Sequence, residues 1–201
     1  MSRLAEIARR IDACRACALC TSATHAVPGE GPADAAVMLV GEAPGAAEDR
    51  SGRPFVGASG RVLDGLLQRA GLSRGQVFIA NVVKHRPPEN RDPTPVEIHA
   101  CRPFLEQQIA VIAPLVIVPL GRHAARHWLP DIRIGSDHGV PQRVADRLIV
   151  PMLHPAAGLY QPRNMPLLQA DFERLGVLLR EGVAGGARTD RENDHGISTQ
   201  S

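Results

Sequence analysis

The chain has 201 residues, of which 44% are hydrophobic and 22% are charged, enough for one α/β domain with a sizeable core. Its net charge of +2 is compatible with nucleic-acid binding but too small to argue for it alone. No apolar run approaches membrane-spanning length, and residues 1–10 lack the apolar stretch of a secretory signal. We therefore expect an intracellular, cytoplasmic protein with no membrane partner, whose thiols stay reduced.

The N-terminal segment is expected to form a short amphipathic helix over residues 3–13, followed by a cysteine-rich loop. Cys14, Cys17 and Cys20 have the spacing C-x2-C-x2-C, and Cys101 stands far away in the sequence. In a reducing compartment this spacing favours ligation of a metal or an iron–sulfur cluster over disulfide formation. Buried, unreactive thiols are the alternative, and the close grouping of three cysteines makes it the weaker one.

Four short apolar runs are predicted strands, at residues 35–40, 77–83, 115–120 and 147–153. Helical patterns lie between and after them, at residues 59–70, 95–112 and 122–128 and in a last helix that carries Leu168, Phe172, Leu175 and Leu179. Strands that alternate with helices predict a mainly parallel sheet with helices on both faces. We expect one domain over residues 1–181 and, because its composition is rich in Gly and charge, a disordered tail over residues 182–201.

Polar residues follow three of the predicted strands at the point where each strand ends. Gly41 and Glu42 follow the first strand, Asn81 lies at the end of the second, and His154 follows the fourth. Because the carboxyl ends of parallel strands meet at one edge of a sheet, we expect these residues to share a pocket. The Gly- and acid-rich loop of residues 41–58 leaves the same edge. Neither a G-x-G-x-x-G motif after the first strand nor a P-loop motif is present, so nucleotide binding by those routes is not supported.

Seven segments of the chain resemble the family 4 uracil-DNA glycosylases, bacterial and archaeal base-excision enzymes with an iron–sulfur cluster. They are Cys14-x2-Cys17, Gly-Glu-Ala-Pro-Gly at 41–45, Gly-Arg-Pro-Phe-Val-Gly at 52–57, Asn-Val-Val-Lys at 81–84, Arg-Pro-Pro-x-Asn-Arg at 86–91, Ala-Cys-Arg-Pro at 100–103 and His-Pro-Ala at 154–156. One such segment is a weak match, whereas all of them in order and at matching spacing are specific. The resemblance implies a three-layer α/β/α fold around a four-stranded, mainly parallel sheet. It also implies hydrolysis of the bond between uracil and deoxyribose in DNA.

The chemistry of the strand-end residues fits this resemblance, because a base must leave the duplex before it can be attacked. Phe55 offers a flat face on which uracil can stack. Asn81 can accept from uracil N3–H and donate to O4, a pattern that cytosine reverses. His154 can donate to uracil O2, where negative charge grows as the glycosidic bond breaks. Glu42 and Glu48 are both candidates to position water or to stabilise the cationic sugar.

The resemblance extends the expected substrate contacts. It adds Gly41 and Ala43 to the pocket. Ser59 lies at a turn that opens a helix, whose amides can hold a DNA phosphate. Leu159 is a candidate wedge into the base stack, although the family often continues after His-Pro-Ala with Tyr, two leucines and Arg, and this chain does not. Taken singly, Phe55, Asn81 and His154 also have structural interpretations, as a loop anchor, a turn cap and a packed histidine.

The expected cofactor is a 4Fe-4S cluster, and three of its ligands follow from the resemblance. Cys14, Cys17 and Cys101 match the ligands of the family. His85 stands where the family usually has its remaining cysteine, and histidine ligates iron–sulfur clusters in Rieske centres. We expect His85 to be the fourth ligand, with Cys20 as the alternative.

Two other functions stay open from the sequence. The family X glycosylases, which become covalently joined to uracil-DNA, resemble this chain at residues 83–85. They also carry a Lys/Arg-rich insertion with a reactive histidine, which the interval 86–99 lacks. A non-catalytic iron–sulfur protein that senses redox state or binds DNA is the other alternative, and the presence of Glu42, Asn81 and His154 speaks against it. We expect a monomer that acts on uracil in single- or double-stranded DNA, with the nucleoid of a bacterium or archaeon.

Overall fold

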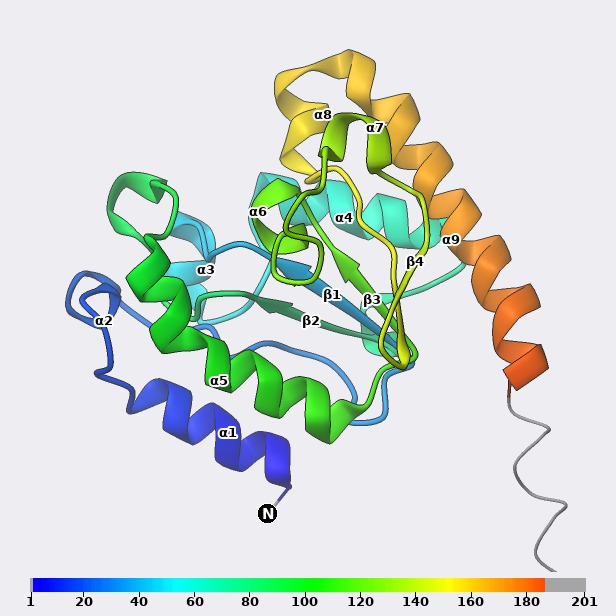
Figure 1. The fold of residues 1–201 in the computed structure, drawn as a ribbon. Helices are drawn as coiled ribbons and strands as arrows, with labels where there is room; N and C mark the ends of the chain where they lie inside the picture. The colour runs from blue at the N-terminus through cyan, green and yellow to red at the C-terminus, as the bar shows by residue number, and fades with distance from the viewer. Residues whose placement is uncertain (1, 187–201) are drawn as a thin grey trace, which may run out of the picture.

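The computed structural model describes residues 2–186, in which one sheet lies between two layers of helices (Figure 1). The sheet has five strands in the order β2-β1-β3-β5-β4. Strand β1 pairs in parallel with β2 and β3, β3 pairs in parallel with β5, and β4 is antiparallel to β5. The predicted three-layer, mainly parallel α/β/α fold is therefore confirmed. The strands are β1 (Val37–Gly41), β2 (Val77–Asn81), β3 (Val116–Pro119), β4 (Gln142–Val144) and β5 (Arg147–Ile149).

The prediction of four strands was incomplete, because it omitted β4. This strand has only three residues, none of them fully buried, and it forms a hairpin with β5 across a turn at residues 145–146. Ala145 in that turn has a left-handed backbone, with φ 52°. Pairing with β5, rather than burial of its own side chains, stabilises β4. Its sequence therefore contains no apolar run that would predict a strand.

Alternate residues of the central strands enter two separate cores. In β1 all five residues are buried, and Val37 and Leu39 face the core under α4 (Ala58–Arg69) and α9 (Met165–Gly186). Met38 and Val40 face the opposite core under α5 (Pro95–Ile112). This alternation follows from the two-residue period of a strand, and burial on both faces is typical of parallel sheets.

The layer that contains α5 also contains α1 (Arg3–Asp12), which packs along α5 (Figure 1). Helix α5 begins at a capping box, in which Thr94 Oγ1 accepts from the Glu97 amide and Glu97 Oε2 accepts from the Thr94 amide. The remaining helical elements are short. They are α2 (Leu19–Ser22), α3 (Ala46–Ser51), α6 (Arg122–Ala125), α7 (Ile134–Asp137), α8 (Ala156–Tyr160), η1 (Arg74–Gln76), η2 (Pro88–Asn90) and η3 (Pro162–Asn164).

The C-terminal helix α9 continues to Gly186, beyond the predicted domain boundary at residue 181. Of the tail predicted over 182–201, residues 187–201 lie outside the described residues. Within residues 2–186, no helix is both long enough and apolar enough to cross a membrane.

Candidate active site

The carboxyl ends of β1 and β2 meet at a glycine that makes room for two side chains. Gly41 and Asn81 are register partners across the two strands. A Cβ atom on Gly41 would lie 2.4 Å from Asn81 Oδ1 and 2.7 Å from a ring carbon of Phe55. Any larger residue would therefore collide with both, and the structure brings together three residues that the sequence assigned to uracil binding.

The side chain of Asn81 is buried and incompletely satisfied. Only 1% of its surface is exposed, and its Oδ1 atom has no hydrogen-bond partner. An unpaired buried oxygen is costly, so it marks a site where a ligand can supply the missing donor. Among the described residues, the other buried side-chain oxygen or nitrogen without a partner is Glu42 Oε1, at the same edge of the sheet.

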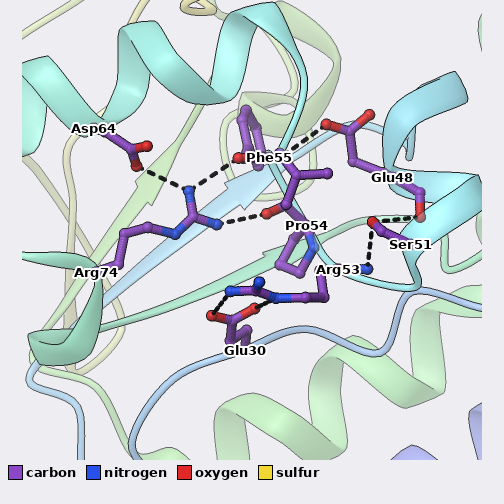
Figure 2. A network of polar contacts seen from close by, with 9 residues as sticks. Glu30, Glu48, Ser51, Arg53, Pro54, Phe55, Asp64 and Arg74 are labelled. Carbon is purple, nitrogen blue, oxygen red and sulfur yellow. Dashed lines mark hydrogen bonds and ion pairs between the residues drawn. The ribbon is translucent and has the colours of Figure 1, made fainter.

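Phe55 is held at the pocket by its backbone. Its φ angle of 52° is rare for a residue with a side chain, and strain of this kind persists where the surroundings enforce it. Arg74 enforces it, because its guanidinium donates to the carbonyl oxygens of Phe55 and Pro54 at 2.9 and 2.6 Å and pairs with Asp64 at 2.9 Å (Figure 2). Gly60 fits beneath, since a Cβ atom there would lie 1.9 Å from the Phe55 carbonyl oxygen.

His154 lies beside Phe55, with ring centroids 5.7 Å apart. Its Nδ1 accepts from the Ala156 amide at 3.2 Å. Burial lowers the pKa of the ring to about 4, an effect that Glu48 partly opposes. The ring is therefore neutral near pH 7 and carries its proton on Nε2, which can donate to a ligand.

Glu42 lies half-buried immediately after β1. Burial, followed by the nearby Asp92 carboxylate, raises the pKa of Glu42 to about 7, while Arg122 acts in the opposite direction. A carboxylate that titrates near neutral pH, with one buried oxygen unpaired, is suited to handling water or a cationic intermediate.

Glu48 occupies a different position from Glu42. Its Oε1 accepts from the amides of Val56 and Gly57 at 2.9 and 2.8 Å, and its Oε2 accepts from the Gly45 amide at 3.1 Å. The carboxylate thus ties the start of α3 to the turn after Phe55. Both of its oxygens are engaged by the backbone, so this geometry favours a supporting role over the water-positioning role that the sequence left open.

A cavity of about 130 Å³ opens next to these residues. Residues 87–92 of the loop after β2 form one of its walls, and the sequence assigned no role to these residues beyond their resemblance to the family. Its Asp92 lies near Glu42, and Arg91 forms a bidentate ion pair with buried Glu97 of α5 at 2.7 and 2.9 Å. The lining residues are Glu42, Ala43, Pro44, Gly45, Pro87, Asn90, Arg91, Asp92 and His154.

Five of the six predicted substrate contacts lie outside that lining, namely Gly41, Phe55, Asn81, Ser59 and Leu159. Ser59 is half-buried in the first turn of α4, and Leu159 is 45% exposed on α8, next to Tyr160, which is 84% exposed. Ala43, by contrast, lines the cavity as expected.

A second, much smaller cavity gathers all of the predicted cluster ligands. It is lined by Ala16, Lys84, Ala100 and Phe104 together with Cys14, Cys17, Cys20, His85 and Cys101. Burial raises the pKa of Cys17 and of Cys101 and lowers that of His85. The Lys84 amide donates to Cys101 Sγ at 3.2 Å, and Cys20 Sγ lies 3.1 Å from the Cys17 carbonyl oxygen. Soft sulfur donors with one neutral imidazole fit an iron–sulfur cluster.

Comparisons with known proteins agree with this geometry. The family model described as "Uracil DNA glycosylase superfamily" matches residues 28–175. A type-4 uracil-DNA glycosylase of Pyrobaculum aerophilum is 50% identical over 171 residues, which cover 80% of this chain and 85% of that protein. Type-4 enzymes of Sulfurisphaera tokodaii and Archaeoglobus fulgidus are each 42% identical over 187 residues. The alignments cover 87% and 89% of this chain and 84% and 94% of those proteins.

Proposed function

The chain belongs to the uracil DNA glycosylase superfamily and is a uracil-DNA glycosylase, and we propose that Phe55, Asn81 and His154 form its uracil pocket. One observation carries this assignment. Asn81 Oδ1 is buried without a hydrogen-bond partner, and both this oxygen and the ring of Phe55 lie within 3 Å of the place that a Cβ atom on Gly41 would take. Uracil N3–H would supply the donor that this oxygen lacks.

Recognition of uracil follows from the amide of Asn81. With Oδ1 paired to N3–H, the amide nitrogen donates to uracil O4. Cytosine presents an acceptor at N3 and a donor at position 4, so both contacts would become repulsive or unpaired. A site built to pair with one pattern rejects the reverse pattern strongly, because its buried groups are left without partners.

Departure of the base is assisted by His154. As the glycosidic bond breaks, the bonding electrons move onto uracil, and negative charge collects on O2. The neutral His154 ring, whose Nδ1 is occupied by the Ala156 amide, donates from Nε2 to that oxygen. A donor aimed at developing charge in a water-poor site stabilises the transition state.

We assign activation of the attacking water to Glu42. The ionised carboxylate stabilises the cationic sugar and accepts the proton of the water whose oxygen bonds to C1′. Glu48 holds the loop that carries Phe55 and contributes through position. Overall, the N1–C1′ bond breaks and one water is consumed. The products are free uracil, protonated at N1, and an abasic sugar with a C1′ hydroxyl.

The cysteine-lined cavity is proposed to hold the 4Fe-4S cluster, with Cys14, Cys17, His85 and Cys101 as ligands. When bound, the cluster supplies a cross-link between the N-terminal segment and the sheet, since its ligands come from three separated parts of the chain. Cys101 lies on α5 and His85 lies four residues after Asn81. We propose that residues 1–181 form one domain of which this segment is a part.

DNA is proposed to lie across the carboxyl edge of the sheet. Ser59 at the start of α4 would face a phosphate, and exposed Leu159 would enter the base stack left by the extruded uracil. We also propose that the protein acts as a monomer, in the cytoplasm with the nucleoid, because one chain contains all of the pocket residues and its substrate is DNA.

Multiple turnovers of uracil release distinguish this function from covalent capture of DNA. The protein is incubated with an excess of single- or double-stranded oligonucleotide that contains one uracil, without added metal, and free uracil, abasic sites and covalent adducts are quantified. We expect several moles of uracil per mole of protein and no adduct. One equivalent of adduct without further release would favour the family X mechanism, and no release at all would favour a non-catalytic DNA-binding protein.

A further inference from the structure

Three ionisable side chains from separate elements meet beside the proposed pocket. Glu42 follows β1, Asp92 lies in the loop after β2, and His123 lies in α6, which follows β3. One side-chain oxygen or nitrogen of each lies within 4.8 Å of those of the other two. His123 was not among the residues that the sequence singled out, and the mechanism above does not use it.

His123 stands between the two carboxylates. Its Nδ1 lies 3.9 Å from Glu42 Oε1, the buried oxygen without a hydrogen-bond partner, and its Nε2 lies 3.2 Å from Asp92 Oδ2. The charged groups that face Glu42 are Asp92, Arg122 and, when protonated, His123. About one third of the His123 side chain is exposed, at 31%, so it can exchange protons with solvent.

Nε2 of His123 has two polar neighbours, each of which can pair with one protonation state of the ring. Arg122 Nη2 lies 3.2 Å from Nε2 and can only donate, so it pairs with the neutral ring. Asp92 accepts from Nε2 when the ring is protonated. The protonated ring therefore presents its Nδ1 proton to Glu42, and the neutral ring does so in the tautomer that accepts from Arg122 at Nε2. An N–H or a cation at this place favours the ionised form of the carboxylate.

We propose that His123, anchored by Asp92 and Arg122, is a positioning residue that holds Glu42 ionised and directed at the reacting sugar. The inference rests on the proposed role of Glu42. Only the ionised carboxylate can stabilise the cationic sugar and accept a proton from water. Because burial and Asp92 both oppose ionisation of Glu42, the enzyme gains from a compensating donor on the far side of the carboxylate.

The test is the pH dependence of uracil release in a single turnover, with enzyme in excess, over roughly pH 5–9. The acid limb is the part of the profile where the rate rises with pH as Glu42 ionises. In His123→Gln this limb should move to higher pH by roughly half to one unit, as expected for removing a partly exposed partner that lies about 4 Å away. Below that limb the rate should fall about three- to tenfold. In His123→Lys, which retains a cation, the limb should stay at its wild-type position or move to lower pH.

Two matched controls separate this effect from a general loss of structure. Asp146→Asn removes a surface carboxylate in the exposed turn at the opposite edge of the sheet and should leave the acid limb unchanged. His99→Ala removes an exposed histidine from α5 and should leave the limb unchanged.

An unchanged acid limb in both His123→Gln and His123→Lys would overturn the proposal. Equal loss of rate in the two variants at every pH would also overturn it, since that outcome indicates a structural role. Either result leaves the proposed function intact if the wild-type protein still releases uracil. Failure of the wild-type protein to release uracil would instead contradict the proposed function.

Discussion

At the residue scale, the site consists of ordinary side chains whose surroundings change their chemistry. Asn81 and Glu42 each keep a buried oxygen without a partner, and His154 is kept neutral by burial. The sequence could place these residues at strand ends, because the carboxyl edge of a parallel sheet follows from the alternation of strands and helices. It could not indicate which oxygen lacks a partner, since that depends on packing between elements far apart in the chain.

The raised pKa of Glu42 predicts how the rate of uracil release depends on pH. A pKa of about 7 means that roughly half of the carboxylates are protonated at neutral pH. If the ionised form is active, the single-turnover rate should rise as pH increases through about 7 and then level off. Glu42→Gln should be slow and lack this limb. A variant with the wild-type limb would assign the titration to another group.

His154 predicts a loss in the chemical step. His154→Ala removes the donor to uracil O2 and should lower the single-turnover rate by roughly 10²–10³-fold, as for other lost oxyanion donors. DNA affinity, measured separately by fluorescence anisotropy, should change little. A variant that weakens DNA binding while the rate at saturation stays normal would make His154 a binding residue.

At the scale of elements, the loop between β1 and α4 departs most from what the sequence indicated. Residues 46–51 of the acid-rich loop form α3, and the two acidic residues of this helix, Glu48 and Asp49, are buried. Glu48 holds the amides on the far side of the loop, while Asp49 Oδ1 accepts from the Thr24 amide at 2.8 Å. Side chain-to-backbone bonds between distant segments produce no local pattern, so buried carboxylates of this kind look solvated in a sequence.

The role of Glu48 can be separated from that of Glu42. Glu48→Ala should leave three backbone amides without their acceptor, lower the melting temperature and displace Phe55. Glu48→Gln keeps an acceptor oxygen and should retain activity within roughly tenfold, whereas Glu42→Gln should lose more than that. Thermal melts and single-turnover rates test both. A greater loss of activity in Glu48→Gln than in Glu42→Gln, at normal stability, would make Glu48 the catalytic carboxylate.

At the scale of the whole molecule, the two cavities share one segment of chain. Asn81 ends β2 at the proposed uracil pocket. After it, Lys84 and His85 line the cysteine cavity, and Pro87, Asn90, Arg91 and Asp92 line the larger one. Buried Lys84 donates from Nζ to the Asn81 carbonyl oxygen and to Gln108 of α5 at 2.8 and 2.7 Å. The family motifs predicted both sites, and the fold explains why they are adjacent. No local sequence pattern predicted the edge strand β4 or the extension of α9 to Gly186.

The identity of the fourth cluster ligand is tested by paired substitutions. His85→Cys should retain or strengthen an iron–sulfur cluster, and Cys20→Ser should leave it intact. Iron content and visible absorption of the purified proteins measure this independently of activity. Loss of iron in Cys20→Ser together with full iron content in His85→Ala would reverse the assignment and make Cys20 the ligand.

The central claim is that the pocket of Phe55, Asn81 and His154 recognises and releases uracil. It is tested most directly by single-turnover base release from matched oligonucleotides that differ only in uracil or cytosine, with a metal chelator present. The wild-type protein should release uracil alone. Asn81→Asp should release uracil more slowly and raise the ratio of cytosine to uracil release, because the donor to O4 is replaced by an acceptor. Unchanged uracil release in Asn81→Ala, or a strict requirement for magnesium in the wild type, would contradict the account.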